Sequence, residues 1–213
     1  MSVPDRVRNE PRQPNISDAR DDNAYVTTRE FSIPAVLVQE QMQKISLTAL
    51  QNSEEIMNNT QTLITALENA PDIIISLVRE VPPQNLKRRP GPNKWSAHEH
   101  ACHIFSADPI YLSRLDLMLS DPAPYIRSVV PSPEEEAGSL LNIDLEEALN
   151  QYLKVRVHLV KRLKMLSAED WQRKAEHEAF SHYSVMIMFR ELLMHEMHHA
   201  YRIEELLLKK EWE

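Results

Sequence analysis

Histidine clusters are the feature of this sequence that could carry out chemistry. Of the nine histidines in the chain, six fall in two tight groups. These groups are His98, His100 and His103, and His195, His198 and His199. Neutral imidazoles bind Zn, Ni, Fe or Cu, so a fold that brings the groups together would create a transition-metal site. Three protein ligands would leave a coordination position for water or substrate, as in catalytic sites.

The second group lies on one face of a predicted helix. His195 and His199 occupy two places in a run of apolar residues that recur at steps of three and four, so they should lie one turn apart on a buried face. A single buried histidine is usually a hydrogen-bonded core residue, whereas a shared metal ion would satisfy both rings. His198 lies on a more polar line and is expected near solvent or behind the ligands. The run from His195 through Glu196 to His199 also fits the His-Glu-x-x-His motif of zinc proteases, which is a rival interpretation.

A third ligand must come from another segment of the chain. Periodicity does not choose between His100 and His103, because both can be placed on the apolar stripe of the preceding helix. His98 lies beside the start of that helix and is the weakest candidate. The remaining histidines, which stand alone and are expected at the surface or as caps, are His158, His177 and His182.

Other polar side chains near the histidines could assist a metal ion. The carboxylates in question are Glu99, Asp108 and Glu196. The more frequent role of such carboxylates is a solvated charge or a helix cap. Tyr111 and Tyr201 could line a pocket, although aromatic core packing is the commoner use. Cys102 points about 100° away from its neighbour His103 on a helix, so it is not counted as a ligand.

The elements that must position these residues are predicted to be helices. Apolar residues recur at three- and four-residue steps over four segments. The segments span residues 54–79, 96–120, 145–166 and 184–209. Ser96 and Glu99 have the spacing of a capping box, while Pro71 and Pro109 predict a kink or a restart within the first two segments. Four long helices with two long connections predict an all-α four-helix bundle.

The first 50 residues are predicted to form an extension to a domain that spans residues 51–213. Residues 1–30 are rich in Pro, Arg, Asp and Asn and lack periodic apolar positions, which indicates disorder. Residues 33–50 have weak helical character, which fits either a helix packed on the bundle or one that stands apart from it.

Composition argues against several other classes of protein. Only 2 glycines occur in 213 residues, which disfavours β-sandwiches, barrels and glycine-rich phosphate loops. The net charge of −8 makes nucleic acid a poor partner, because phosphate contacts need clustered Lys and Arg. There is no apolar run long enough to span a membrane and no apolar signal region at the N-terminus. A single cysteine, Cys102, fits a cytoplasmic protein.

Three short motifs in order resemble the DinB-like family. Within Arg89–Ser96 a Pro/Gly-containing loop leads into Lys-Trp-Ser, and His103 follows eight residues after the tryptophan, as a ligand histidine does in that family. Residues 193–203 are similar to the family's last helix, in which two ligand histidines lie four residues apart. Residues 168–171, Ala-Glu-Asp-Trp, are similar to the exit of its third helix. The resemblance covers about residues 50–210.

The resemblance implies a four-helix bundle in which His103, His195 and His199 bind one divalent metal ion, such as Zn, Ni or Fe. It further implies an enzyme that acts on a small molecule, either a hydrolase or an S-transferase that uses a low-molecular-weight thiol, and it disfavours the zinc protease. Family members active as bacillithiol transferases often have Arg-Gly-Gln after the last ligand, where residues 200–202 here are Ala-Tyr-Arg. The alternative hypotheses are a non-catalytic stress- or damage-response bundle and a scaffold that forms a homodimer.

Overall fold

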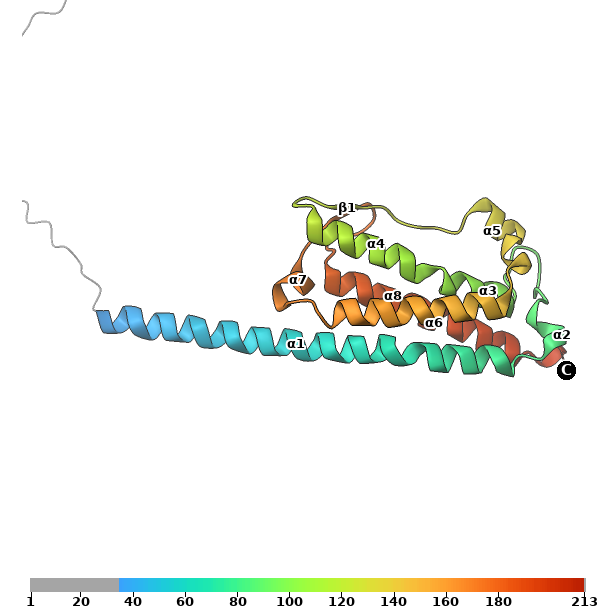
Figure 1. Cartoon of the computed structure of the whole chain (residues 1–213), viewed down its shortest axis with the longest axis horizontal. Coiled ribbons are helices and arrows are strands. Elements are labelled where there is room, and N and C mark those ends of the chain that lie inside the picture. Colours follow the sequence, from blue (N-terminus) through green and yellow to red (C-terminus); the bar gives the residue numbers. More distant parts are fainter. Residues whose placement is uncertain (1–34, 213) are drawn as a thin grey trace, which may run out of the picture. The chain divides into compact units, whose positions relative to one another are not determined.

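Four long helices pack into a bundle in this computed structural model, which describes residues 35–212 apart from several side chains of residues 35–53 (Figure 1). They are α1 (Ala35–Glu80), α3 (Ala97–Phe105) continued by α4 (Ala107–Ser120), α6 (Leu145–Leu163) and α8 (Val185–Leu207). In Figure 1, α1 and α8 run in one direction, and α3, α4 and α6 run in the other. The predicted all-α four-helix bundle is confirmed. Among the described helices, none has the length and apolar character needed to cross a membrane.

The first helix starts earlier than the sequence pattern predicts. α1 begins at Ala35 rather than near Glu54, because no proline or glycine interrupts residues 35–70 and the helix simply continues. Residues 44–213 form one compact unit. The domain boundary at residue 50 stays a prediction, and the predicted disorder of residues 1–30 lies outside the described residues.

Pro71 lies inside α1 without ending it. Proline lacks the N–H that would bond the carbonyl oxygen of Leu67, four residues earlier. That oxygen instead accepts a hydrogen bond of 2.7 Å from Nη1 of Arg156 on α6. The helix is therefore continuous rather than restarted, because a tertiary contact supplies the missing donor.

The second predicted helix is divided at Ser106. Pro109 has no N–H to donate to the carbonyl oxygen of Phe105, so the α-helical ladder cannot pass through this turn. The Ser106 N–H bonds back to the carbonyl oxygens of His103 and Ile104 and closes α3, and α4 then begins at Ala107 with Pro109 in its first turn. The break leaves His103 in the last turn of α3.

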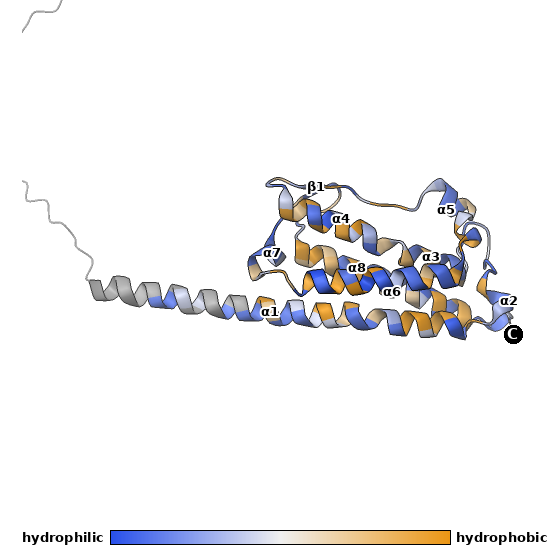
Figure 2. Ribbon diagram, viewed as in Figure 1, coloured by the Kyte–Doolittle hydropathy of each residue, from blue (hydrophilic) through white to orange (hydrophobic). Residues whose placement is uncertain are grey.

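The bundle core consists of two apolar clusters with a polar layer between them. One cluster contains Leu63, Leu115, Leu159 and Phe189, and the other contains Ile74, Ala101, Leu149 and Ile203. Figure 2 shows apolar positions along every bundle helix, interrupted by hydrophilic ones. At the level between the clusters, α4, α6 and α8 each contribute a buried charged residue: Asp108, Arg156 and Glu196.

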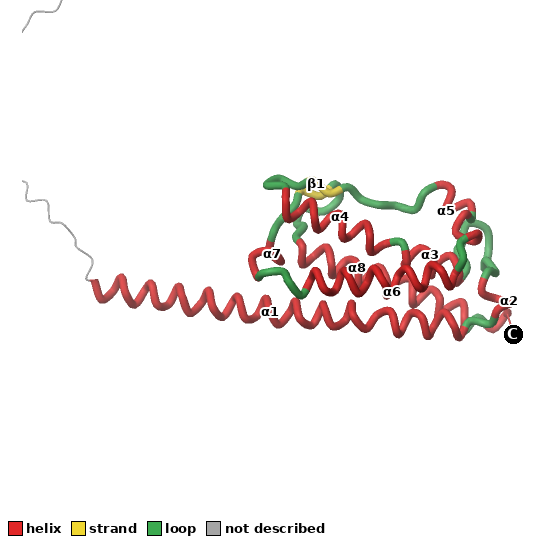
Figure 3. Tube along the Cα trace, in the orientation of Figure 1, coloured by secondary structure: helices red, strands yellow, loops and turns green. Residues whose placement is uncertain are grey.

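Two long connections complete the unit. The chain from α4 to α6 contains β1 (Tyr125–Ile126), α5 (Pro133–Ala137) and the 3-10 helix η1 (Ser139–Asn142), and Figure 3 shows it returning along the length of α4 and α3. The chain from α6 to α8 contains α7 (Ala168–Gln172) and β2 (Glu176–His177), which pairs in parallel with β1. The short elements next to the ends of α1 and α8 are α2 (Pro83–Leu86) and η2 (Lys210–Trp212).

Candidate metal centre

Three imidazoles from two helices converge in the bundle. His103 comes from the end of α3, and His195 and His199 lie one turn apart on α8. The Nε2 atom of His195 lies 3.2 Å from Nε2 of His103 and 3.2 Å from Nε2 of His199. Two nitrogen ligands of one tetrahedral metal ion would be about 3.3 Å apart, given metal–nitrogen bonds of roughly 2.0–2.1 Å. The donor set therefore fits a shared metal ion.

Burial keeps these rings uncharged at neutral pH. Loss of solvent, followed by the proximity of other imidazoles, lowers the pKa of His195 to about 4 and that of His199 to about 2. Burial also lowers the pKa of His103. Neutral imidazoles have a lone pair available for a cation, so the cluster is ready to bind a metal ion without first losing protons.

The structure also distinguishes His100 from His103, the two candidates for the third ligand that periodicity leaves open. His103 joins the cluster, whereas His100 lies behind His199, with the Nδ1 atoms of the two rings 2.8 Å apart. If Nε2 of His199 is a metal ligand, its Nδ1 carries the proton and donates it to Nδ1 of His100. His98 has a different task, because its Nε2 lies 3.1 Å from the carbonyl oxygen of Leu140 and joins α3 to η1.

Trp95 packs over the same cluster. Its ring centroid lies 4.8 Å from that of His103 and 5.9 Å from that of His199, with which it is stacked. Trp95 precedes the N-cap of α3, where the predicted capping box between Ser96 and Glu99 is confirmed. The capped start of α3 thus places the tryptophan against the imidazoles.

Two of the three candidate helper carboxylates belong to the buried polar layer. Arg156 binds Asp108 through two hydrogen bonds of 2.8 Å and also binds both oxygens of Glu196. With the bond to Leu67, each of the five guanidinium N–H groups has an acceptor. Burial and the nearby Asp108 raise the pKa of Glu196 to about 7, against the effect of Arg156.

Those contacts bear on the zinc-protease interpretation. In the His-Glu-x-x-His motif the glutamate serves as general base at the metal ion. Here both oxygens of Glu196 are held by Arg156, and one of them also accepts a hydrogen bond of 3.1 Å from Tyr152. The third candidate, Glu99, caps α3 and pairs with Arg89. All three carboxylates therefore have structural partners.

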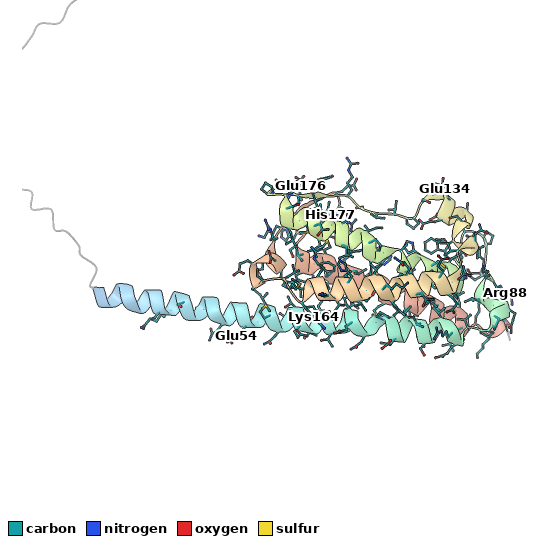
Figure 4. The ribbon with its side chains drawn as sticks, viewed as in Figure 1. Glu54, Arg88, Glu134, Lys164, Glu176 and His177 are labelled. Atoms are coloured by element: carbon teal, nitrogen blue, oxygen red, sulfur yellow. The ribbon has the colours of Figure 1, made fainter. Side chains whose placement is uncertain are left out.

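A cavity of about 280 Å³ opens on two of the three histidines, His103 and His195. Its other polar lining residues include Tyr111, Arg114, His177 and Glu191. His177, expected at the surface or as a cap, is buried in this wall at the end of β2, and Figure 4 labels its side chain. Its Nδ1 accepts a hydrogen bond of 3.0 Å from the N–H of Ala179, which leaves Nε2 as the ring nitrogen that carries a proton.

Other residues singled out in the sequence lie away from the cluster or face solvent. The exposed ones are His158, His182, His198 and Tyr201. Cys102 is buried, and burial raises the pKa of its thiol to about 11, so it is a core residue. Sequence reasoning missed Arg156, although its place on an apolar stripe between Tyr152 and Leu159 is a signal that it is buried and paired.

Comparisons with known proteins agree with this architecture. The family model described as DinB superfamily matches residues 66–203. YfiT from Bacillus subtilis, described as a probable metal-dependent hydrolase with an unusual four-helix bundle topology, superimposes with a TM-score of 0.62 at 19% identity, over 72% of this chain and 89% of that one. A DinB-like protein from Bacillus cereus gives a TM-score of 0.50 at 16% identity, over 68% and 89% of the two chains. No curated protein matches the sequence.

Proposed function

Because this chain belongs to the DinB superfamily, we propose that it is a metal-dependent hydrolase of a small molecule, with His103, His195 and His199 as ligands of one divalent ion. The observation that carries the proposal is the convergence of three uncharged Nε2 donors, two of which belong to histidines that line a cavity. Zn, Ni and Fe all suit three imidazoles. Such an ion, held by three protein ligands, supplies Lewis acidity that activates water or a thiol.

The cavity offers groups that can hold a small polar substrate beside the histidines. The Nε2–H of His177 and the guanidinium of Arg114 are donors for an acyl or carboxylate oxygen. Arg114 is itself braced by a hydrogen bond of 2.6 Å to the carbonyl oxygen of Arg127. One oxygen of Glu191 accepts a bond of 2.6 Å from Tyr183, which fixes the carboxylate in the wall. Apolar contacts come from Ile110, Val129 and Phe180.

The hydrolase is favoured over thiol S-transfer by one comparison, because YfiT is described as a probable metal-dependent hydrolase. That likeness shows the shared fold, and the activity is carried over here as part of the proposal. A screen should therefore contain ester and amide substrates together with low-molecular-weight thiols and electrophiles. If only the thiol substrates turn over, the proposed activity would be S-transfer rather than hydrolysis.

Elemental analysis of protein purified without a polyhistidine tag tests the metal centre directly. We expect about one Zn, Ni or Fe per chain in the wild type and none in H199A. The matched control is H198A, which removes an exposed histidine next to His199 and should retain both the metal and the activity. Activity of the wild type should disappear on chelation and return when the metal is restored.

Two outcomes would contradict the proposal. A wild type that contains no metal and takes none up would favour the non-catalytic bundle. A wild type that binds metal normally but turns over nothing in the screen would favour a binding or structural role for the ion. Size-exclusion chromatography of the same samples would show whether the chain forms the homodimer that the scaffold hypothesis requires.

A further inference from the structure

The short helix α5 brings a carboxylate to the rear of one candidate ligand. Glu135 lies at the third position of α5, and its Oε1 is 3.7 Å from Nδ1 of His103. This is the ring nitrogen that does not face the other two histidines, since Nε2 of His103 points toward His195. The α5 segment lies in the connection between α4 and α6, far from α3 in the sequence.

A capping box fixes the orientation of this carboxylate. Oε2 of Glu135 accepts a hydrogen bond of 2.8 Å from the N–H of Ser132, and the Ser132 hydroxyl accepts one of 3.2 Å from the N–H of Glu135. One carboxylate oxygen is thus engaged in holding the helix terminus. The other oxygen is the one that lies beside His103.

The helix α5 is also fastened to the helix that carries His103. Nη2 of Arg89 donates a hydrogen bond of 3.2 Å to the carbonyl oxygen of Glu136, and the same guanidinium pairs with Glu99 in the first turn of α3. Gly138, with φ of 108°, ends α5, and a Cβ there would lie 3.2 Å from Nη2 of Arg89. The tether therefore keeps Glu135 close to the end of α3.

The chemistry of a metal-bound imidazole requires an acceptor at this position. A histidine that binds a metal ion through Nε2 carries its proton on Nδ1, and a partner for that proton orients the ring and raises its basicity. Nδ1 of His103 is buried and has no hydrogen-bond partner among the described residues. His199 already has His100 in that role.

We propose that Glu135 is a positioning residue of the metal centre, whose Oε1 accepts the Nδ1–H of His103 when its Nε2 is a ligand. The inference rests on the metal site of the proposed function and extends it, because it makes the α4–α6 connection part of that site. Glu135 does not touch the substrate cavity and acts only through His103. The neighbouring Glu134, labelled in Figure 4, is exposed on α5.

The test is the affinity of the full-length protein for Zn²⁺, measured by competition with a chromogenic chelator. We expect E135A to bind Zn²⁺ about 10–100-fold more weakly than the wild type, the range found for removal of such partners. E135Q offers a single acceptor oxygen to the two N–H groups of Ser132 and His103, so it should recover only part of the loss. E134Q is the matched control and should bind like the wild type.

A further variant, S132A, separates positioning from helix capping. S132A removes the serine half of the capping box but leaves the carboxylate of Glu135, so its Zn²⁺ affinity should stay within about twofold of the wild type, because the ligand partner is intact. Wild-type affinity in E135A, or an equal loss in S132A and E135A, would overturn the inference. A wild type that binds no Zn²⁺ would overturn it together with the metal centre. If E135A binds Zn²⁺ more weakly but the wild type hydrolyses nothing, only the proposed hydrolase activity would be contradicted, and the positioning role of Glu135 would stand.

Discussion

His100 and His199 face each other through their Nδ1 atoms, 2.8 Å apart, although 99 positions separate them in the sequence. One of the two nitrogens must donate and the other accept. Because Nε2 of His199 faces His195, binding of a metal ion there assigns the proton to Nδ1 of His199 and the acceptor role to His100. Binding of a metal ion at His199 would therefore fix the tautomers of both rings.

This relationship predicts that His100 supports metal affinity without being a ligand. The variant H100F keeps a ring in the same place but has no acceptor for the Nδ1–H of His199. We expect its affinity for Zn²⁺ to fall about 10–100-fold, with the stoichiometry still one ion per chain. Chelator competition measures the affinity and elemental analysis the stoichiometry. Loss of all metal would instead identify His100 as a ligand, and unchanged affinity would show that the contact is immaterial.

Substitution of Arg156 in the buried polar layer should lower the free energy of unfolding strongly. In R156M, Asp108 and Glu196 lose the guanidinium that binds them, and the Leu67 carbonyl loses its donor. Removing one partner of a buried ionic group costs about 3–5 kcal/mol of unfolding free energy, because the remaining charge has no compensation. The triple variant D108N/R156M/E196Q removes the charges together and should be less destabilised than R156M alone.

Urea denaturation at pH 8 and pH 6 checks this prediction. Burial already raises the pKa of Glu196 to about 7, and loss of Arg156 removes a group that opposes this rise. Glu196 can therefore be protonated at the lower pH, and the deficit of R156M should be smaller at pH 6 than at pH 8. A triple variant as unstable as the single one would mean that packing rather than charge causes the loss.

The contact that His98 makes between α3 and η1 should weaken in acid. Burial, followed by the charge of Lys87, lowers the pKa of this imidazole, and the Leu140 carbonyl and Glu99 oppose the shift less strongly. A folded-state pKa below the unfolded value means that the unfolded chain binds the proton more tightly. The contribution of His98 to stability is therefore present above the unfolded pKa and is lost as pH falls toward the folded one.

The comparison of wild type with H98Q isolates this effect. The Gln amide can donate to the Leu140 carbonyl but does not titrate. We expect the unfolding free energy of the wild type to fall more steeply than that of H98Q between pH 7.5 and 5.5, by at most about 1.4 kcal/mol per pH unit for one proton. Parallel pH profiles for the two proteins would contradict the role of His98.

The sequence by itself determined the features that depend on neighbours three or four residues apart. Helical periodicity predicted the bundle, the Ser96–Glu99 spacing predicted the start of α3, and the one-turn spacing of His195 and His199 placed both rings on one helix face. These properties follow from the geometry of a single helix, which repeats every 3.6 residues regardless of what packs against it. The continuation of α1 through Pro71 and the break at Ser106 were harder to predict, because they depend on the donors available nearby.

Only the tertiary structure decided which side chains from different helices meet. His103 rather than His100 joins His195, across 92 positions, because the packing of α3 against α8 brings the Nε2 atoms of these two rings together. The roles of Arg156 and Glu135 also depend on helices that are distant in sequence. A periodic pattern specifies the face on which a residue lies, but the partner opposite that face is set by how the helices pack.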